Sequence, residues 1–284
     1  MKYTVLAAVC AGALWLGGCK AAPAGAEKTE ATPSEARVIQ VVPETIAPLG
    51  LDGQVLPYLA DVDLGVLSHG HYDHADGLRR FFQLNQRAKV YVRPQAGGPY
   101  FSMTEEGPKF IGVHRDIWEG ARERLVPVPG PMELLEGGWL LPDGPKDPAF
   151  MGKASNLVCK RGEDDFVPDD FSHEQSLVLE GERGLVVFNS CSHGGIVNIV
   201  RGVLDQLPGK RVHAVVGGLH MYAKGGTGMN CSPEYVQSVA DALKALGVER
   251  ILTGHCTGQP ALERLTEYFG PGCQGLYTGQ VFTL

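Results

Sequence analysis

The sequence has 284 residues, of which 44% are apolar, and it carries a formal net charge of −7. A chain of this length and apolar content can bury one large hydrophobic core. The acidic balance and the lack of lysine and arginine runs exclude a nucleic-acid surface, because phosphate binding needs clustered positive charge. We therefore expect a globular protein with no nucleic-acid partner.

Residues 1–18 are typical of an export signal. They contain one charged residue, Lys2, followed by an apolar run too short to span a bilayer well and by small residues. The next residue, Cys19, resembles the lipidated cysteine of a bacterial lipobox, which predicts a lipid anchor on a membrane. Because Lys20 rather than an acidic residue follows, analogy favours the periplasmic face of the outer membrane. An ordinary cleaved secretory signal is the alternative.

Residues 19–35 predict a flexible tether between this anchor and the rest of the protein. Alanine, proline, glutamate, lysine and threonine dominate the segment, and it has no large apolar residue that could stabilise a packed structure. We expect the folded domain to occupy residues 36–284.

A histidine-rich run follows Val62–Leu67, an apolar stretch with the pattern of a buried strand. Strand side chains alternate, so a strand that leaves Leu67 would place His69 and His71 on one side. A helix that begins near Asp73 would add Asp73 and His74 beside them. Imidazole and carboxylate are ligands that zinc, iron and manganese accept, and two such ions about 3.5–4 Å apart can share a water. The alternative is a histidine-rich surface turn.

The remaining patterns predict strands and helices in alternation, mainly in the C-terminal half. We expect long loops over residues 94–124, with one strand near Phe110–Val113, and another loop-rich segment over 142–170. The other expected elements, in chain order, are a strand at 37–42, a helix at 75–86, a strand at 89–92, two strands within 125–141, a hairpin of 175–179 with 184–189, a helix at 195–207, a strand at 212–216, a helix at 233–246, a strand at 250–253 and a helix at 260–269.

Three further histidines, His193, His220 and His255, come directly after apolar strands. A strand end can aim a side chain into a shared cleft without disturbing the core, and functional residues concentrate on the loops there. This placement groups the three with the histidine-rich run. An isolated histidine with a structural role in the core is the alternative for His193.

These motifs resemble those of the metallo-β-lactamase-fold metallohydrolases, and most closely the dihydropterin ribofuranosylaminobenzene phosphate synthase-like branch. The resemblance runs from about Asp61 to the C-terminus. It implies an α/β fold, an αββα sandwich, with a shortened N-terminal sheet, because the tether leaves room for little more than one strand before Asp61. The domain is trimmed at that edge, or another chain covers it, as in a homodimer, or the protein is a degenerate copy. The motifs that carry the resemblance are His69-x-His71-x-Asp73-His74, Cys191-Ser192-His193-Gly194-Gly195, Gly217-Gly218-Leu219-His220 and Gly254-His255-Cys256-Thr257-Gly258.

The same resemblance implies two metal ions, with one ligand set for each. The first set is His69, His71 and His193, and the second is Asp73, His74 and His255.

Two further residues compete for places in these sets. His173 precedes a paired strand and is the rival of His193 as third ligand of the first ion. Cys191 occupies or neighbours the place of a bridging aspartate in relatives, and a thiolate there would favour zinc or iron over manganese.

The resemblance implies hydrolysis of a small-molecule ester, lactone, thioester or phosphodiester by a metal-bound hydroxide. Asp73 would orient the attacking oxygen, and His220 would contact the substrate or carry a proton. Asp76 and Thr257 are the nearest candidates in sequence to orient the ligands. A synthase-like transferase is an alternative that we rank lower, because an exported protein would not meet its cytosolic intermediates. A non-catalytic metal-binding lipoprotein and a redox-active iron site are the others.

Overall fold

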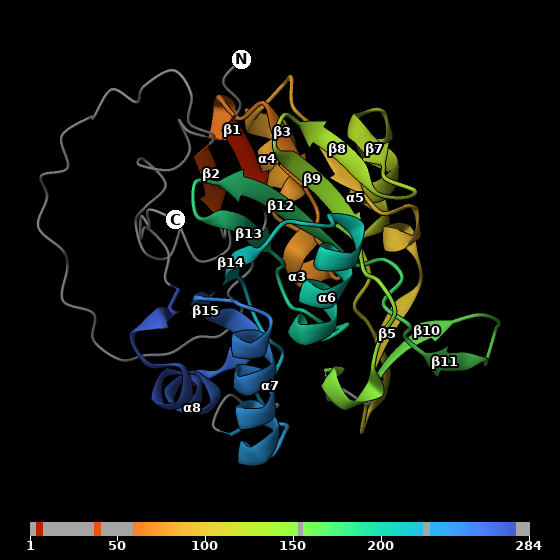
Figure 1. Cartoon of the computed structure of the whole chain (residues 1–284). Coiled ribbons are helices and arrows are strands. Elements are labelled where there is room, and N and C mark those ends of the chain that lie inside the picture. The colour runs from red at the N-terminus through yellow and green to blue at the C-terminus, as the bar shows by residue number, and fades with distance from the viewer. Residues whose placement is uncertain (1–3, 8–36, 41–58, 153–155, 224–227, 277–284) are drawn as a thin grey trace, which may run out of the picture.

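The computed structural model describes residues 4–7, 37–40, 59–152, 156–223 and 228–276, arranged as Figure 1 shows. In these residues the strands form sheets of five, four and seven strands. Cys19 and the expected tether lie outside the described residues, as does the expected signal except for strand β1 (Thr4–Ala7). No helix in the described part of the chain has the length and apolar character needed to cross a bilayer.

The five-stranded sheet is parallel throughout, in the order β2-β1-β3-β4-β7. Between the expected tether and Asp61 the described residues contain one strand, β2, in agreement with the short N-terminal region predicted. The predicted helix after the histidine run is split into α3 and α4. Its elements are β2 (Arg37–Gln40), β3 (Leu64–Val66), α3 (Tyr72–Ala75), α4 (Leu78–Leu84), β4 (Lys89–Val92) and β7 (Leu125–Pro127).

The seven-stranded sheet has the order β16-β15-β14-β13-β12-β9-β8 and confirms the predicted C-terminal alternation. The hairpin of β12 and β13 is antiparallel, whereas β13, β14, β15 and β16 run parallel. Its elements are β8 (Met132–Leu135), β9 (Gly138–Pro142), β12 (Gln175–Gly181), β13 (Gly184–Phe188), α6 (Ile196–Gln206), β14 (Val212–Val216), α7 (Pro233–Ala245), β15 (Arg250–Thr253), α8 (Gln259–Phe269) and β16 (Cys273–Gly275).

The two large sheets face each other, and helices cover their outer faces (Figure 1). Leu64 and Val66 of the first sheet pack with Leu140 and Leu177 of the second. The alternate residues face the helices, as Val90 and Val92 do with Phe81 of α4, and Val187 does with α6 and α7. This alternation follows from the period of two in a strand and produces the αββα layers.

The four-stranded sheet, in the order β11-β10-β5-β6, corrects the expectation of loops over 94–124 and 142–170. Instead of a strand near Phe110–Val113 there is a hairpin, with a short helix after it. Strand β10 pairs with β5 across more than fifty residues of sequence. The elements are β5 (Tyr100–Thr104), β6 (Gly107–Phe110), α5 (Arg115–Gly120), β10 (Leu157–Lys160) and β11 (Phe166–Pro168).

Candidate metal centre

The histidine-rich run crosses from the end of β3 into α3, as predicted. His69 and His71 lie in the extended part, with ring centroids 4.7 Å apart. Helix α3 then carries Asp73 and His74. The backbone at Gly70 is closely packed, because a Cβ there would lie 2.3 Å from the carbonyl oxygen of Ala96. The loop is therefore held against the rest of the first sheet, and its side chains point to one place.

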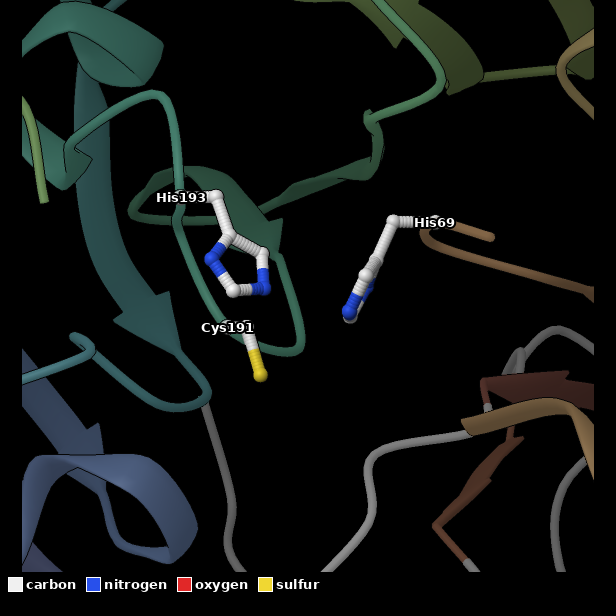
Figure 2. Close-up of side chains that lie close together, drawn as sticks. All are labelled: His69, Cys191 and His193. Carbon is white, nitrogen blue, oxygen red and sulfur yellow. The ribbon is translucent and has the colours of Figure 1, made fainter. Parts of the chain in front are cut away.

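The C-terminal motifs meet this run at the ends of their strands. The His193 ring lies 4.8 Å from the rings of both His69 and His71, and the His255 ring lies 5.0 Å from that of His74. Figure 2 shows His69, Cys191 and His193 projecting into one space from different segments. The convergence predicted for residues far apart in the sequence is thus present.

Cys191 lies between two groups of donor atoms. One group is Cys191 with His69 and His193, and the other is Cys191 with His74 and His255; the donor atoms of each group lie within 4.8 Å of one another. The Cys191 Sγ atom is 3.1 Å from His74 Nε2 and 3.2 Å from His255 Nε2.

Asp73 belongs to the second group. Its Oδ2 atom is 3.5 Å from His74 Nε2 and 3.9 Å from His255 Nε2. The six predicted ligands therefore lie together, with Cys191 in the position between the two groups.

The structure distinguishes His193 from its rival His173. His173 uses both ring nitrogens, since Nδ1 accepts a hydrogen bond from Gly70 N at 2.9 Å and Nε2 lies 3.0 Å from Asp169 Oδ2. Both nitrogens of His193 are buried and have no hydrogen-bond partner in the described part of the chain. His71, Asp169 and His173 also form a group of donors, but its hydrogen bonds are internal. The geometry favours His193 as the ligand and His173 as an anchor for the loop.

The imidazoles are in the protonation state that metal binding requires. Burial lowers the pKa of His69 and His193 well below the usual value, and it lowers the pKa of His74 to about 3. His69 Nε2 and His71 Nε2 are also buried without a hydrogen-bond partner among the described residues. Neutral, unbonded imidazole nitrogens in close proximity fit a divalent cation.

The thiol of Cys191 needs a cation more than the imidazoles do. Burial raises the pKa of Cys191 well above the usual value, so the thiol keeps its proton unless a positive charge stabilises the thiolate. Binding of a divalent ion here would release that proton.

The residues that orient the candidate ligands are not those suggested by sequence proximity. Asp76 accepts from His114 and pairs with Arg79, and Thr257 accepts from the backbone of Leu219; neither has a hydrogen bond to a candidate ligand. Instead the Ser68 hydroxyl lies 2.9 Å from His69 Nδ1.

Asp169 lies in the same layer, 3.7 Å from His71 Nε2. Burial alone would raise the pKa of Asp169, but hydrogen bonds from His173 and His71 lower it. The only sequence signal for this residue was an aspartate four positions before a histidine.

His220 lies beside the donor groups. Its ring centroid is 4.3 Å from that of His193, and its Nδ1 atom is buried with no hydrogen-bond partner among the described residues. Burial lowers the pKa of His220, but the neighbouring Cys256 thiol outweighs this effect and raises it overall.

A cleft of about 1070 Å³ opens over these side chains. His71, Asp73, Cys191, His193, His220 and His255 form its floor, and the hairpin of β5 and β6 forms one wall. Tyr72, Tyr222 and Asn156 add aromatic and amide groups to the lining. The predicted residues therefore face a space large enough for a small-molecule ligand.

No family model matches this chain. It is 28% identical over 226 residues to 7,8-dihydropterin-6-methyl-4-(beta-D-ribofuranosyl)-aminobenzene-5'-phosphate synthase of Methanocaldococcus jannaschii, which covers 78% of this chain and 74% of that protein. It is 27% identical over 214 residues to an uncharacterised protein of the same organism, covering 72% and 73% of the two chains. Among solved structures, Tm1679, described as a metal-dependent hydrolase of the beta-lactamase superfamily, matches with a TM-score of 0.66 and 26% identity, over 83% of this chain and 84% of that one.

The sheets and flanking helices constitute the α/β metallo-β-lactamase fold, which confirms the fold predicted from the motifs. This chain is therefore a metallo-β-lactamase-fold protein with groups of His, Asp and Cys side chains suited to metal. It is similar to the metal-dependent hydrolase Tm1679 and distantly related to the dihydropterin synthase.

Proposed function

We propose that this protein is a hydrolase with two divalent ions, zinc by preference, that acts on an ester, lactone or phosphodiester. The observation that carries the proposal is the place of Cys191 in two donor groups, one with His69 and His193 and one with His74 and His255. When bound, two such ions lower the pKa of a shared water and polarise a carbonyl or phosphoryl oxygen. The thiolate and imidazole donors favour zinc or iron over manganese.

The residues around the donors supply orientation and proton transfer. The side chain of Asp73 is 33% exposed and lines the cleft, so its carboxylate can orient an incoming water as well as bind metal. The unbonded Nδ1 of His220 can give a proton to a leaving group in the same cleft. The volume of the cleft suits a substrate of tens of non-hydrogen atoms.

A transferase reaction like that of the dihydropterin synthase is the second candidate, favoured by the 28% identity over 78% of this chain. It would use the same donors and cleft. We rank it below hydrolysis because the proposed export would separate the protein from cytosolic intermediates. Incubation of the purified protein with dihydropterin and ribosyl phosphate donors, and analysis of the products by mass spectrometry, distinguishes the two.

Removal of metal should abolish turnover. We expect the purified protein to hydrolyse generic lactone or phosphodiester substrates, to lose this activity with a chelator and to regain it with zinc. His71→Ala should lower kcat/KM by about 10³-fold, since it removes a ligand and with it several kcal/mol of transition-state stabilisation.

His114→Ala is the matched control for this experiment. His114 is bonded to Asp76 and lies outside the donor groups, so its loss should leave activity unchanged. Stoichiometric metal without turnover of any substrate class would favour the non-catalytic metal-binding alternative.

We also propose that the protein is exported and anchored through a lipid on Cys19, on the periplasmic face of the outer membrane. Support comes from the signal-like composition of residues 1–18 and the cysteine that follows it. In a bacterial host fed labelled palmitate, the full chain should take up label and sediment with membranes, whereas Cys19→Ser should do neither. An unlabelled, soluble wild-type protein would contradict the anchor.

A further inference from the structure

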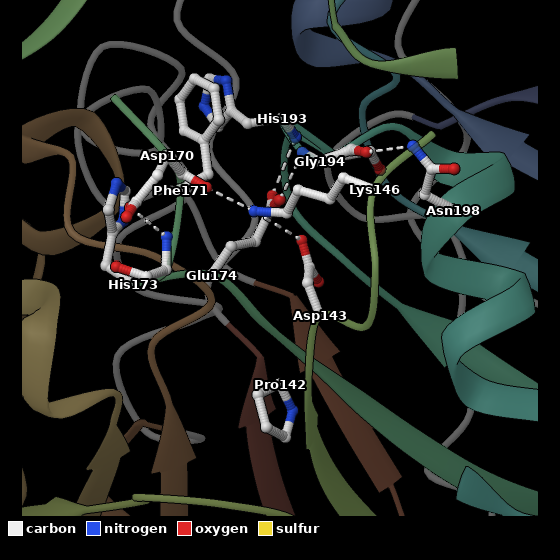
Figure 3. Close-up of polar contacts among 12 residues, drawn as sticks. Pro142, Asp143, Lys146, Asp170, Phe171, His173, Glu174, His193, Gly194 and Asn198 are labelled. Carbon is white, nitrogen blue, oxygen red and sulfur yellow. Dashed lines mark hydrogen bonds and ion pairs between the residues drawn. The ribbon is translucent and has the colours of Figure 1, made fainter. Parts of the chain in front are cut away.

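A pair of buried carboxyl groups lies directly behind the turn that carries His193. Glu174 is fully buried at the start of β12, and Asp143 follows the end of β9. The Nζ atom of Lys146 is 3.9 Å from Asp143 Oδ2 and donates to the backbone oxygen of Asp170. Figure 3 shows these groups clustered beneath His193 and Gly194. Two buried acids and one ammonium group are costly to desolvate, so a role for them has to be sought.

Glu174 holds the backbone on both sides of the His193 peptide unit. Its Oε1 atom accepts from His193 N at 2.9 Å, and its Oε2 atom accepts from Gly194 N at 2.7 Å. The carbonyl oxygen of His193 accepts from Gly152 N at 3.3 Å. A bidentate carboxylate allows little rotation of the peptide groups that it binds, and so it fixes the direction of the His193 Cα–Cβ bond.

The ring of His193 is fixed by the same turn that carries Glu174. Phe171 stacks on it with centroids 4.7 Å apart and an interplanar angle of 8°. Lys146 Nζ lies 5.8 Å from the Phe171 ring centroid on the other side. Phe171 thus controls the ring of His193 while Glu174, three residues later, controls its backbone.

Asp143 packs against the opposite side of the turn. A Cβ on Gly194 would lie 2.2 Å from Asp143 Oδ2, so only glycine fits between this carboxyl and the peptide that Glu174 binds. Asn198 of α6 completes the enclosure by donating to Gly194 O at 2.8 Å. The turn is therefore held from the strand side, the loop side and the helix side.

We propose that Glu174 is a positioning residue for His193, and that Asp143 and Lys146 hold Glu174 in place for this role. The inference rests on the proposed function in that His193 is taken as a metal ligand. Glu174 itself touches neither metal nor substrate, and it acts by presenting His193 to the space that His69 and His71 face.

The test compares Glu174→Ala and Glu174→Gln in the full chain by zinc competition with a chromogenic chelator, which resolves two binding steps. Glu174→Ala should weaken one step by about 10- to 100-fold, the range for residues that orient a ligand, and leave the other unchanged. Glutamine keeps the shape of Glu174 and can donate to Asp143, but it can accept from only one of the two backbone N–H groups. It should weaken the same step less.

A structural role alone would not give this pattern. The increase in melting temperature on adding zinc should be smaller in both variants than in the wild type, because this increment reports metal affinity rather than the stability of the apoprotein. In a His193→Ala background, Glu174→Ala should weaken zinc binding no further, since its effect passes through His193. Glu180→Gln, in the same strand and paired with Lys210 at the surface, is the matched control and should bind zinc as the wild type does.

Several results would overturn the proposal. They are wild-type zinc affinity in both Glu174 variants, an undiminished effect of Glu174→Ala in the His193→Ala background, failure of even Glu174→Gln to fold, and absence of zinc binding in the wild type. If the wild type binds zinc but hydrolyses nothing, the proposed hydrolase fails while the zinc affinities still decide the role of Glu174.

Discussion

His193→Ala should remove one equivalent of bound metal and lower hydrolytic kcat/KM by about 10³-fold, because loss of one ligand removes several kcal/mol of transition-state stabilisation. The expectation follows from its two unbonded, buried nitrogens and its contacts with the rings of His69 and His71. Elemental analysis after desalting gives the metal content, and steady-state kinetics give the activity.

His173→Asn is the variant that makes this result specific. Both nitrogens of His173 are already bonded, to Gly70 and Asp169, and asparagine can still accept from Gly70 N. We expect full metal content, with a loss of stability of about 1–3 kcal/mol because a buried hydrogen bond to Asp169 is broken. The reverse pattern, with metal lost in His173→Asn and kept in His193→Ala, would assign the third ligand to His173.

The C-terminal half could be predicted closely because its signals are local. Strands β13, β14 and β15 are buried on both faces, so they read as continuous apolar runs, and α6 and α7 have apolar residues at helical spacing. Because parallel strands place their carboxyl ends at one edge, the motifs after these strands could be grouped without a structure.

The four-stranded sheet could not be predicted because its pairing is not local. Strand β6 contains Gly107 and Pro108, and β10 is short and pairs with a partner more than fifty residues away. No alternation over so few residues distinguishes a strand from a loop. This sheet forms a wall of the cleft, which explains why the shape of the substrate site was not predictable either.

The candidate ligands were predictable and the residues that orient them were not. Histidines and Cys191 are chemically distinctive and follow strands, whereas Asp169 and Glu174 are ordinary carboxylates whose partners are set by the tertiary fold. Sequence proximity suggested Asp76, which instead pairs with His114 and Arg79 on the other side of α3 from the donor groups. Orientation of a ligand thus depends on which loops pack behind it, and no spacing rule encodes that.

Cys191→Asp should change the preferred metal and remove a thiolate signal. Because Cys191 takes part in both donor groups, the cobalt-loaded wild type should show a thiolate-to-metal charge-transfer band in the near ultraviolet, and Cys191→Asp should lack it. Aspartate supplies a harder oxygen donor, so manganese should gain affinity relative to zinc. Cys191→Ala, with no donor at all, should lower kcat/KM by about 10³-fold.

Two other cysteines test whether this signal belongs to Cys191. Cys159, half-buried on β10, lies outside the donor groups, and Cys159→Ala should keep the band. Cys256 is buried and forms a third group with Cys191 and His220, so it is the one rival thiolate among the described residues near the candidate ligands. A band that survives Cys191→Asp and disappears in Cys256→Ser would move the thiolate ligand to Cys256, and Cys191 would then lose its place between the two ions.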